Sequence, residues 1–183
     1  MRNLALVGES RREIELPELA PPGPNGRHAV DIFQTVSDGF SDGSSSFVLT
    51  NDGFLLKVHN NNNNDNNKPE WIAPLDQLCE NPGGEWFDLS YVDSGNELLL
   101  VCLSHNGAIV TVDPTSGQAE LVGEFEHGLQ TGAFSPDGEL LCLLTFSEPE
   151  EEETTKRNSA LLLMNAQWDV LAEVNIPAHI PSE

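Results

Sequence analysis

Positively charged residues are scarce in this chain of 183 residues. It has 8 Lys and Arg against 30 Asp and Glu, which gives a formal net charge of −22 at pH 7. An acidic field of this size repels phosphate backbones, so we expect no direct nucleic-acid binding by this segment. The sequence also has no apolar run near the roughly 18 residues of a membrane span, and its first apolar run is too short for a signal peptide. We therefore expect no membrane partner.

Cysteine is scarce too. The chain has only Cys79, Cys102 and Cys142, an odd number with no pair at the spacing of metal ligands. Cys102 and Cys142 stand inside apolar runs, where a free cysteine acts as a small core residue. This usage favours a reducing, intracellular compartment.

The motifs of catalytic and cofactor sites are missing as well. There is no His-Glu-x-x-His, no Cys-x-x-Cys, no glycine-rich phosphate loop and no Gly-x-Ser-x-Gly. We therefore predict no catalytic, cofactor-binding or metal-binding residue and no cofactor, so the chain is not expected to be an enzyme. We interpret His105 as an exposed hairpin residue and Asp113 as a turn residue. The remaining histidines are scattered, and the tryptophans are interpreted as packing residues: His28, His59, His127 and His179; Trp71, Trp86 and Trp168.

What the sequence does contain is a repeat of short apolar runs separated by turn signals. Asn106-Gly107 is typical of a tight hairpin, because a type I′ turn needs positive φ at both central residues. The unit that contains it is followed by a second, and Glu97-Leu98 aligns with Glu139-Leu140 at a spacing of 42 residues. Four strands in about 40–45 residues indicate a β-propeller blade. Pro136-Asp137-Gly138 alone would predict only a lone hairpin turn.

The predicted fold class is therefore all-β, a partial WD40-like β-propeller of about three four-stranded blades that form an incomplete ring. A ring needs at least about four blades, so we expect the chain to be a fragment or a truncated copy. The predicted segments are N-terminal strands at 1–16; a Pro/Gly linker at 17–28; a first blade at 29–78 with an Asn-rich insert at 59–68; a second blade at 85–126; a third blade at 129–177 with an acidic loop at 147–158; and a tail at 178–183.

The ordered set of strands and turns resembles the N-terminal propeller of Elongator complex protein 1, the IKAP family. The similarity covers the first residues and about half of the chain, and residues 9 to 84 diverge from it. The residues that carry it are Met1 to Leu4, Leu98 to Leu103, Gly107 to Val112, Leu121 to Gly123, Gly132 to Asp137, Ala160 to Asn165 and Trp168 to Glu173.

This resemblance implies a non-catalytic scaffold segment of a complex that modifies wobble uridines of tRNA. The implied partners are other Elongator subunits, namely an acetyltransferase-like catalytic subunit and a second propeller subunit. The implied location is the cytoplasm, with the nucleus as a second location. The alternative is an unrelated WD40-like adaptor for protein interaction, and a propeller enzyme comes third because no site is visible.

Overall fold

A computed structural model describes residues 26–34, 45–59, 68–93, 98–126, 128–135, 138–147 and 158–176 of the chain. These residues form three four-stranded antiparallel sheets, in each of which neighbouring strands follow one another in sequence. The strands of the first sheet are β1 (Ala29–Gln34), β2 (Ser45–Thr50), β3 (Phe54–His59) and β4 (Trp71–Pro74). Those of the second are β5 (Trp86–Asp93), β6 (Leu98–Ser104), β7 (Ala108–Val112) and β8 (Ala119–Glu124). Those of the third are β9 (Gly128–Phe134), β10 (Leu140–Ser147), β11 (Asn158–Asn165) and β12 (Val170–Ile176).

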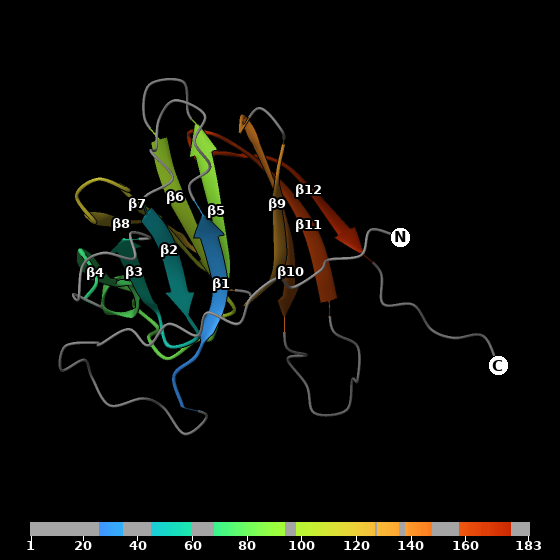
Figure 1. The fold of residues 1–183 in the computed structure, drawn as a ribbon. Helices are drawn as coiled ribbons and strands as arrows, with labels where there is room; N and C mark the ends of the chain where they lie inside the picture. The colour runs from blue at the N-terminus through green and yellow to red at the C-terminus, as the bar shows by residue number, and fades with distance from the viewer. Residues whose placement is uncertain are drawn as a thin grey trace, which may run out of the picture.

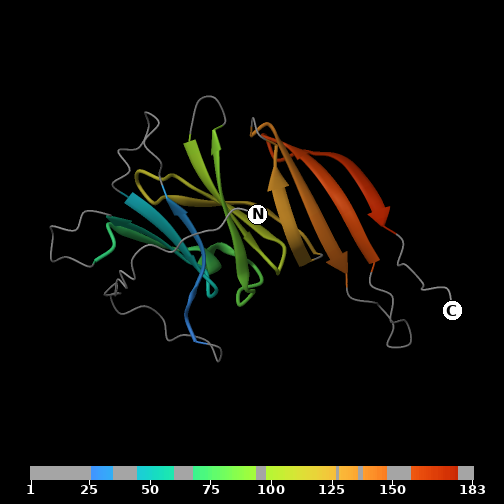
Figure 2. The ribbon, with the colours of Figure 1, turned by 45° about the vertical axis from the view of Figure 1, so that its right-hand side comes forward.

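The three sheets stand side by side like the leaves of a fan, with the third sheet at one end (Figures 1 and 2). The first strand of each sheet lies innermost, because β1 contacts β5 and β5 contacts β9. The predicted fold class is confirmed: the protein is all-β, its sheets are blade-like, and they do not close a ring. Within the described residues, the single short helix η1 (Leu75–Leu78) is not of a length that could cross a membrane.

The turns explain why the second and third strands of the first two sheets pair so regularly. Gly53 ends the β2–β3 turn with φ +78°, and Gly107 ends the β6–β7 turn with φ +97°. Both values lie in the left-handed region, where glycine carries no Cβ penalty. The strands β2 and β3 form a hairpin with the same outline as β6 and β7.

The middle sheet is apolar on both faces, and each face belongs to a different core. One core fills the space between the first and second sheets, where Phe47 and Leu55 meet Leu100 and Val110. The other fills the space between the second and third sheets, where Leu103 and Ile109 meet buried residues of β9–β11. Sheets covered on both faces have continuous rather than alternating apolar strands, which is the pattern of Leu98–Ser104.

Several predicted segments fall largely or wholly outside the described residues. These are the N-terminal strands, the Pro/Gly linker, the Asn-rich insert, the acidic loop and the tail, so they and the predicted blade boundaries remain predictions. Beyond the Asn-rich insert, β4 pairs with β3 to complete the first sheet, and η1 directly follows β4.

Candidate interaction surface

The sequence assigns no histidine to a catalytic site, and the described histidines lie in different parts of the structure. His59 is exposed, with Nε2 3.2 Å from a carboxylate oxygen of Glu70. His28 begins the first sheet, and its backbone N–H donates to Asn51 Oδ1. His127 and His179 lie outside the described residues. The described part of the chain contains no group of three or more His, Cys, Asp or Glu side chains that could hold a metal ion.

The interpretation of His105 as an exposed hairpin residue is wrong. Its ring is half-buried and stacks on Phe87, with ring centroids 4.4 Å apart. The ring Nδ1 lies 2.7 Å from the carbonyl oxygen of Leu129, which accepts the ring N–H. His105 therefore ties the β6–β7 turn to the first strand of the third sheet, a contact between sheets that short-range sequence reasoning does not include.

The same backbone hydrogen bonds join each sheet to the next. The N–H of Trp86, at the start of β5, donates to the carbonyl of Asn51 at 3.1 Å. The N–H of Leu129, near the start of β9, donates to the carbonyl of His105 at the same distance. In both cases the acceptor opens the turn between the second and third strands. We call each contact between neighbouring sheets a joint. The two joints contain the same backbone hydrogen bond, so the joints repeat along the molecule as the strands do.

Two of the tryptophans fill the first joint, as expected for packing residues. Trp86 is 1% exposed and Trp71 packs against the same core. A Cβ on Gly53 would meet the Trp86 indole, and a Cβ on Gly117 would stand 2.7 Å from Trp71 Cδ2. Each indole is therefore seated against a glycine that leaves room for it.

Trp168 belongs to the turn that precedes the outer strand β12 (Val170–Ile176). It has φ 68°, and its N–H donates to the carbonyl of Asn165 before β12 begins at Val170. Its side chain packs against the second core. Asp113 is a turn residue, as predicted, since its Oδ1 accepts the backbone N–H groups of Thr115 and Ser116. These hydrogen bonds lower the pKa of Asp113.

Two carboxylates lie at the innermost strands of the first joint. Asp31 on β1 accepts the backbone N–H of Leu89 at 3.1 Å, and Asp88 is the neighbouring residue on β5. Burial raises the pKa of Asp88, and the nearby Asp31 charge raises it further, although a hydrogen bond from Ser90 opposes both.

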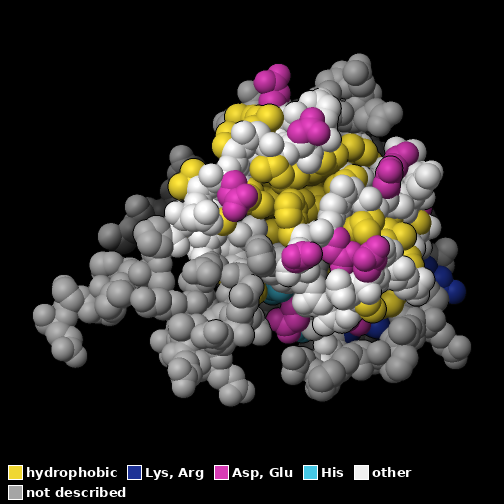
Figure 3. Space-filling model, turned by 180° about the vertical axis from the view of Figure 1, so that it is seen from behind, with side chains coloured by type: hydrophobic (Ala, Val, Ile, Leu, Met, Phe, Trp, Pro, Cys, Tyr) yellow, Lys and Arg dark blue, Asp and Glu magenta, His cyan; other side chains and the backbone are white. Residues whose placement is uncertain are grey.

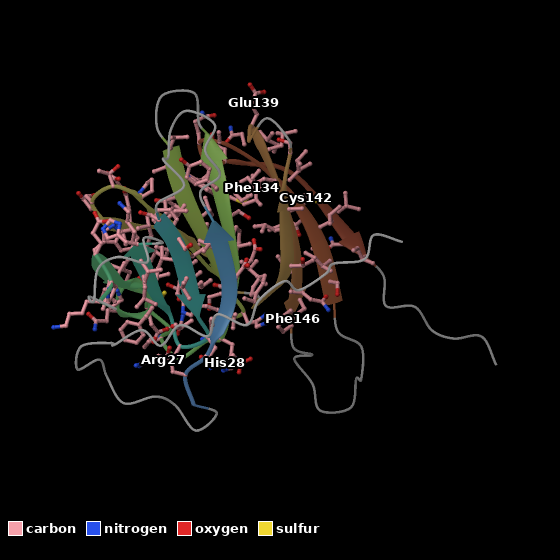
Figure 4. All side chains as sticks on the ribbon, in the orientation of Figure 1. Arg27, His28, Phe134, Glu139, Cys142 and Phe146 are labelled. Carbon is pink, nitrogen blue, oxygen red and sulfur yellow. The ribbon has the colours of Figure 1, made fainter. Side chains whose placement is uncertain are left out.

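The cysteines are free thiols. Burial raises the pKa of Cys102, which is fully enclosed in the first core, and burial with the Glu124 and Asp76 charges raises the pKa of Cys79 to about 11. Because the thiolate is the reactive form, both are poor nucleophiles at neutral pH. Cys142 lies on β10 in the third sheet and is partly exposed (Figure 4).

Most of the large hydrophobic side chains that are exposed among the described residues belong to the third sheet. Strand register places alternate residues of β10 on opposite faces, so that Leu141 and Leu143, almost fully buried, look toward the second sheet. The other face is uncovered: Leu161 is 40% exposed and Val174, its partner in β12, is 58% exposed. We call this surface the open face; its apolar members are Ala133, Leu140, Cys142, Leu144, Leu161, Leu163, Ala172, Val174 and Ile176.

The open face has no charged side chain among the described residues of β9–β12 that share it. An incomplete ring of three blades predicts an uncovered apolar blade face, but sequence reasoning did not single this one out as a site, although Leu140–Ser147 carries the signal. This strand, β10, is apolar at consecutive positions, which predicts that other elements cover both of its faces. In the described structure the second sheet covers one face of β10, and the other face is uncovered.

Charge is distributed unevenly over the molecule. In the described residues Lys and Arg occur only in and beside the first sheet, as Arg27, Lys57 and Lys68, and Pro69 to Thr155 contains none at all. On the back of the molecule hydrophobic side chains form a broad area bordered by Asp and Glu, with Lys and Arg only at one edge (Figure 3). Arg27 pairs with Asp52 at 2.7 Å and lies over the Phe54 ring, at the foot of β1 (Figure 4).

Comparison with known proteins gives one family match. Residues 1–182 match the family model described as the ELP1 first N-terminal beta-propeller. No curated protein matches the chain significantly.

Two solved structures are similar in fold. The β-propeller domain of Myceliophteria thermophila Cps50 (Swd1) has 16% identity and a TM-score of 0.54, over 81% of this chain and 41% of that one. The periplasmic gluconolactonase PpgL of Pseudomonas aeruginosa has 16% identity and a TM-score of 0.47, over 86% of this chain and 42% of that one. The chain thus spans about two fifths of the length of either structure. At this identity the Cps50 likeness shows the fold alone.

Proposed function

Because the chain belongs to the family of the first N-terminal β-propeller of ELP1, we propose that it is a non-catalytic scaffold segment of an Elongator complex. In this role its sheets hold other subunits in place, and the chemistry takes place elsewhere. The observation that carries the proposal is the family match over residues 1–182, together with three blade-like sheets whose buried surface joins sheet to sheet. The family membership sets aside the alternative of an unrelated WD40-like adaptor.

The complex that we assign to this scaffold modifies wobble uridines of tRNA. The partners of the chain in it are an acetyltransferase-like catalytic subunit and a second propeller subunit, and its location is the cytoplasm, with the nucleus as a second location. The chain itself makes no contact with tRNA, since the stretch from Pro69 to Thr155 has no Lys or Arg to neutralise phosphate. The tRNA is therefore held by other parts of the complex.

Affinity purification of the tagged protein from its own cells, followed by mass spectrometry, tests the assembly. The two named subunits are expected among the recovered proteins, and deletion of the gene is expected to lower the amount of modified wobble uridine in bulk tRNA. Recovery without either subunit, together with unchanged tRNA modification in the deletion strain, would refute the proposal.

A separate measurement tests the assignment of tRNA contact to other parts. The purified chain is mixed with bulk tRNA at low and at physiological salt, and binding is followed by fluorescence anisotropy. No binding is expected at either salt concentration. Binding that weakens steeply with salt would show a phosphate contact and would contradict that assignment.

A further inference from the structure

Two apolar residues at the start of β12 are exposed although they lie on the face of the third sheet that packs on the second. Val170 pairs with Met164 and Glu173 pairs with Leu162, and both partners belong to the second core. Leu171, two positions before Glu173, lies on the same face because side chains alternate along a strand. Val170 is 48% and Leu171 is 54% exposed, so the second sheet does not reach far enough outward to cover them.

The outer strand of the second sheet, β8, borders the same space. Glu120 pairs with Thr111, which lies two positions from Ile109 of the second core, so Glu120 faces the third sheet. Val122 of β8 and Trp168 of the turn before β12 pack against that core and are only partly buried. We call the apolar surface of Val122, Trp168, Val170 and Leu171 the outer patch.

The outer patch lies between two sheets that the chain itself supplies. A further sheet on the open face would leave the patch uncovered, because the patch is on the opposite face of the third sheet. Figure 3 views the molecule from the side of the outer strands β8 and β12, and it shows hydrophobic side chains gathered in an area that Asp and Glu border. Contiguous exposed apolar surface with a polar rim marks an interaction site.

Charged groups of one sign surround the outer patch. Glu120 and Glu173 flank it on β8 and β12, and Asp169 precedes it in the turn; all three residues are exposed. The stretches 69–155 and 158–183 contain no Lys or Arg, so the second and third sheets supply no cation to these carboxylates. A ligand that matches the surface therefore brings the positive charge itself.

We propose that the outer patch binds a short apolar segment of a partner protein that is flanked by Lys or Arg residues. The apolar residues of this segment cover Val170 and Leu171, and its cations lie at the surrounding carboxylates. Opposite charges at the rim of such a contact favour encounter and reject wrong partners. The proposal goes beyond the scaffold function and does not depend on it.

The same charges exclude other occupants. A second copy of the chain would set Glu120, Asp169 and Glu173 near identical carboxylates, and like charges brought together cost free energy. The phosphate groups of a nucleic acid are repelled for the same reason. An apolar segment without cations would remove water from the carboxylates and offer no partner in exchange.

The outer patch is small, so binding is expected to be weak and reversible. Contacts that bury less than about 1,200 Å² are typical of transient encounters, and we expect a Kd of about 10–100 μM at a salt concentration of roughly 0.15 M. Salt screens the ionic part of the binding free energy and leaves the apolar part. Raising the salt concentration to about 1 M should therefore weaken binding without abolishing it.

Fluorescence anisotropy with three synthetic peptides tests the proposal on the unaltered full chain. The labelled peptide Arg-Arg-Leu-Leu-Leu-Arg-Arg carries both features of the proposed segment. Arg-Arg-Ser-Ser-Ser-Arg-Arg keeps the charge and loses the apolar centre, whereas Gln-Gln-Leu-Leu-Leu-Gln-Gln does the opposite. The first peptide is expected to bind at least tenfold more tightly than either control peptide.

Two pairs of variants locate the binding. Leu171→Ser should weaken binding of the first peptide at least fivefold, and its matched control is Val174→Ser, because Val174 lies on the same strand with 58% exposure but on the open face. Glu173→Gln should weaken binding of the same peptide at least threefold. Its matched control is Glu80→Gln, an equal change of charge at an exposed residue before β5; both controls should bind like the original chain.

Several results would overturn the proposal. A control peptide that binds as tightly as the first would show that net charge or apolar character alone attracts it. Equal losses of affinity for Leu171→Ser and Val174→Ser would place the binding elsewhere, and self-association that Leu171→Ser abolishes would assign the patch to a second copy. These measurements use no Elongator subunit, so their failure would not refute the proposed function.

Discussion

Replacing Gly53 by Ala should destabilise the protein more than the same change at a turn glycine that has no close neighbour. Gly53 has φ +78°, and a Cβ there would stand 2.9 Å from Trp86 Cδ1 and closer still to the indole Nε1. The left-handed conformation costs an alanine about 1–2 kcal/mol, and overpacking of the buried indole costs about 1–3 kcal/mol more. The total is a loss of about 2–5 kcal/mol.

Gly83→Ala is the matched control. Gly83 has φ +94°, so its alanine carries the same conformational cost, but nothing lies within 4 Å of the added Cβ. Thermal unfolding followed by far-UV circular dichroism compares the two variants in one buffer. For a chain of this size 1 kcal/mol shifts the Tm by about 2–4 °C, so Gly53→Ala should melt about 2–12 °C below Gly83→Ala.

The indole can then be removed to test the cause. In a Trp86→Leu background, held folded by the same concentration of a stabilising osmolyte throughout, the difference between the two alanine variants should fall to within about 0.5 kcal/mol. Equal melting temperatures for Gly53→Ala and Gly83→Ala in the original sequence would refute the close-approach argument. A difference that persists without the indole would assign it to another neighbour.

Three further outcomes follow from charge and burial. Burial raises the pKa of Asp88 above its ordinary value of 3.8. Between the unfolded and the folded pKa the native state binds more protons than the unfolded state, so the stability of the fold decreases as pH rises through this interval. Urea unfolding should therefore show Asp88→Asn to be more stable than the original protein at pH 7, with the gain disappearing at pH 3. Arg27→Ala removes an ion pair and a contact with the Phe54 ring and should cost about 1–2 kcal/mol in the same assay, whereas Arg27→Lys should keep part of it. With a maleimide at pH 7, Cys102 should react only on unfolding and Cys79, whose pKa is raised to about 11, only slowly; fast reaction of Cys102 in the folded chain would contradict its burial.

The strands and their order were accessible from sequence because their signals are local. Asn106-Gly107 and the short apolar runs around it depend on φ and on period, and both are properties of a few consecutive residues. The repeat of 42 residues between Glu97 and Glu139 then gave the number of strands in each unit. The structure shows the second and third sheets of four strands that this pattern predicts.

The contacts between sheets were not accessible in the same way. The contact of His105 with Leu129 spans 24 positions, and nothing in the sequence around an Asn-Gly turn tells whether the next sheet approaches it. The Asp31–Leu89 contact spans 58 positions and depends on how the innermost strands converge. An uncovered blade face follows from the count of three blades, but which residues it exposes does not, because a residue that lacks a neighbour has the same sequence signal as one that has it.

The repeated joints have a consequence for how stability is distributed. When each unit contacts only its neighbours, stability is approximately a sum of unit terms and joint terms. The second sheet contributes to two joints, whereas the third is held by one, through Leu129, Leu141 and Leu143. The first and third sheets, each held by one joint, are therefore easier to open locally than the second sheet.

A surface on an end sheet can influence the folding of that sheet. Any sheet that covers Leu161 and Val174 removes apolar area from water and adds a second joint to a unit that has one. Binding at the open face is thereby coupled to the folding of β9–β12, since a partner that binds only the closed sheet stabilises it by mass action. The first sheet has no comparable exposed surface in its described residues, so the coupling acts at one end of the fan. The asymmetry lies in the exposed apolar area of the described residues, which the third sheet carries and the first sheet, apart from Val30, does not.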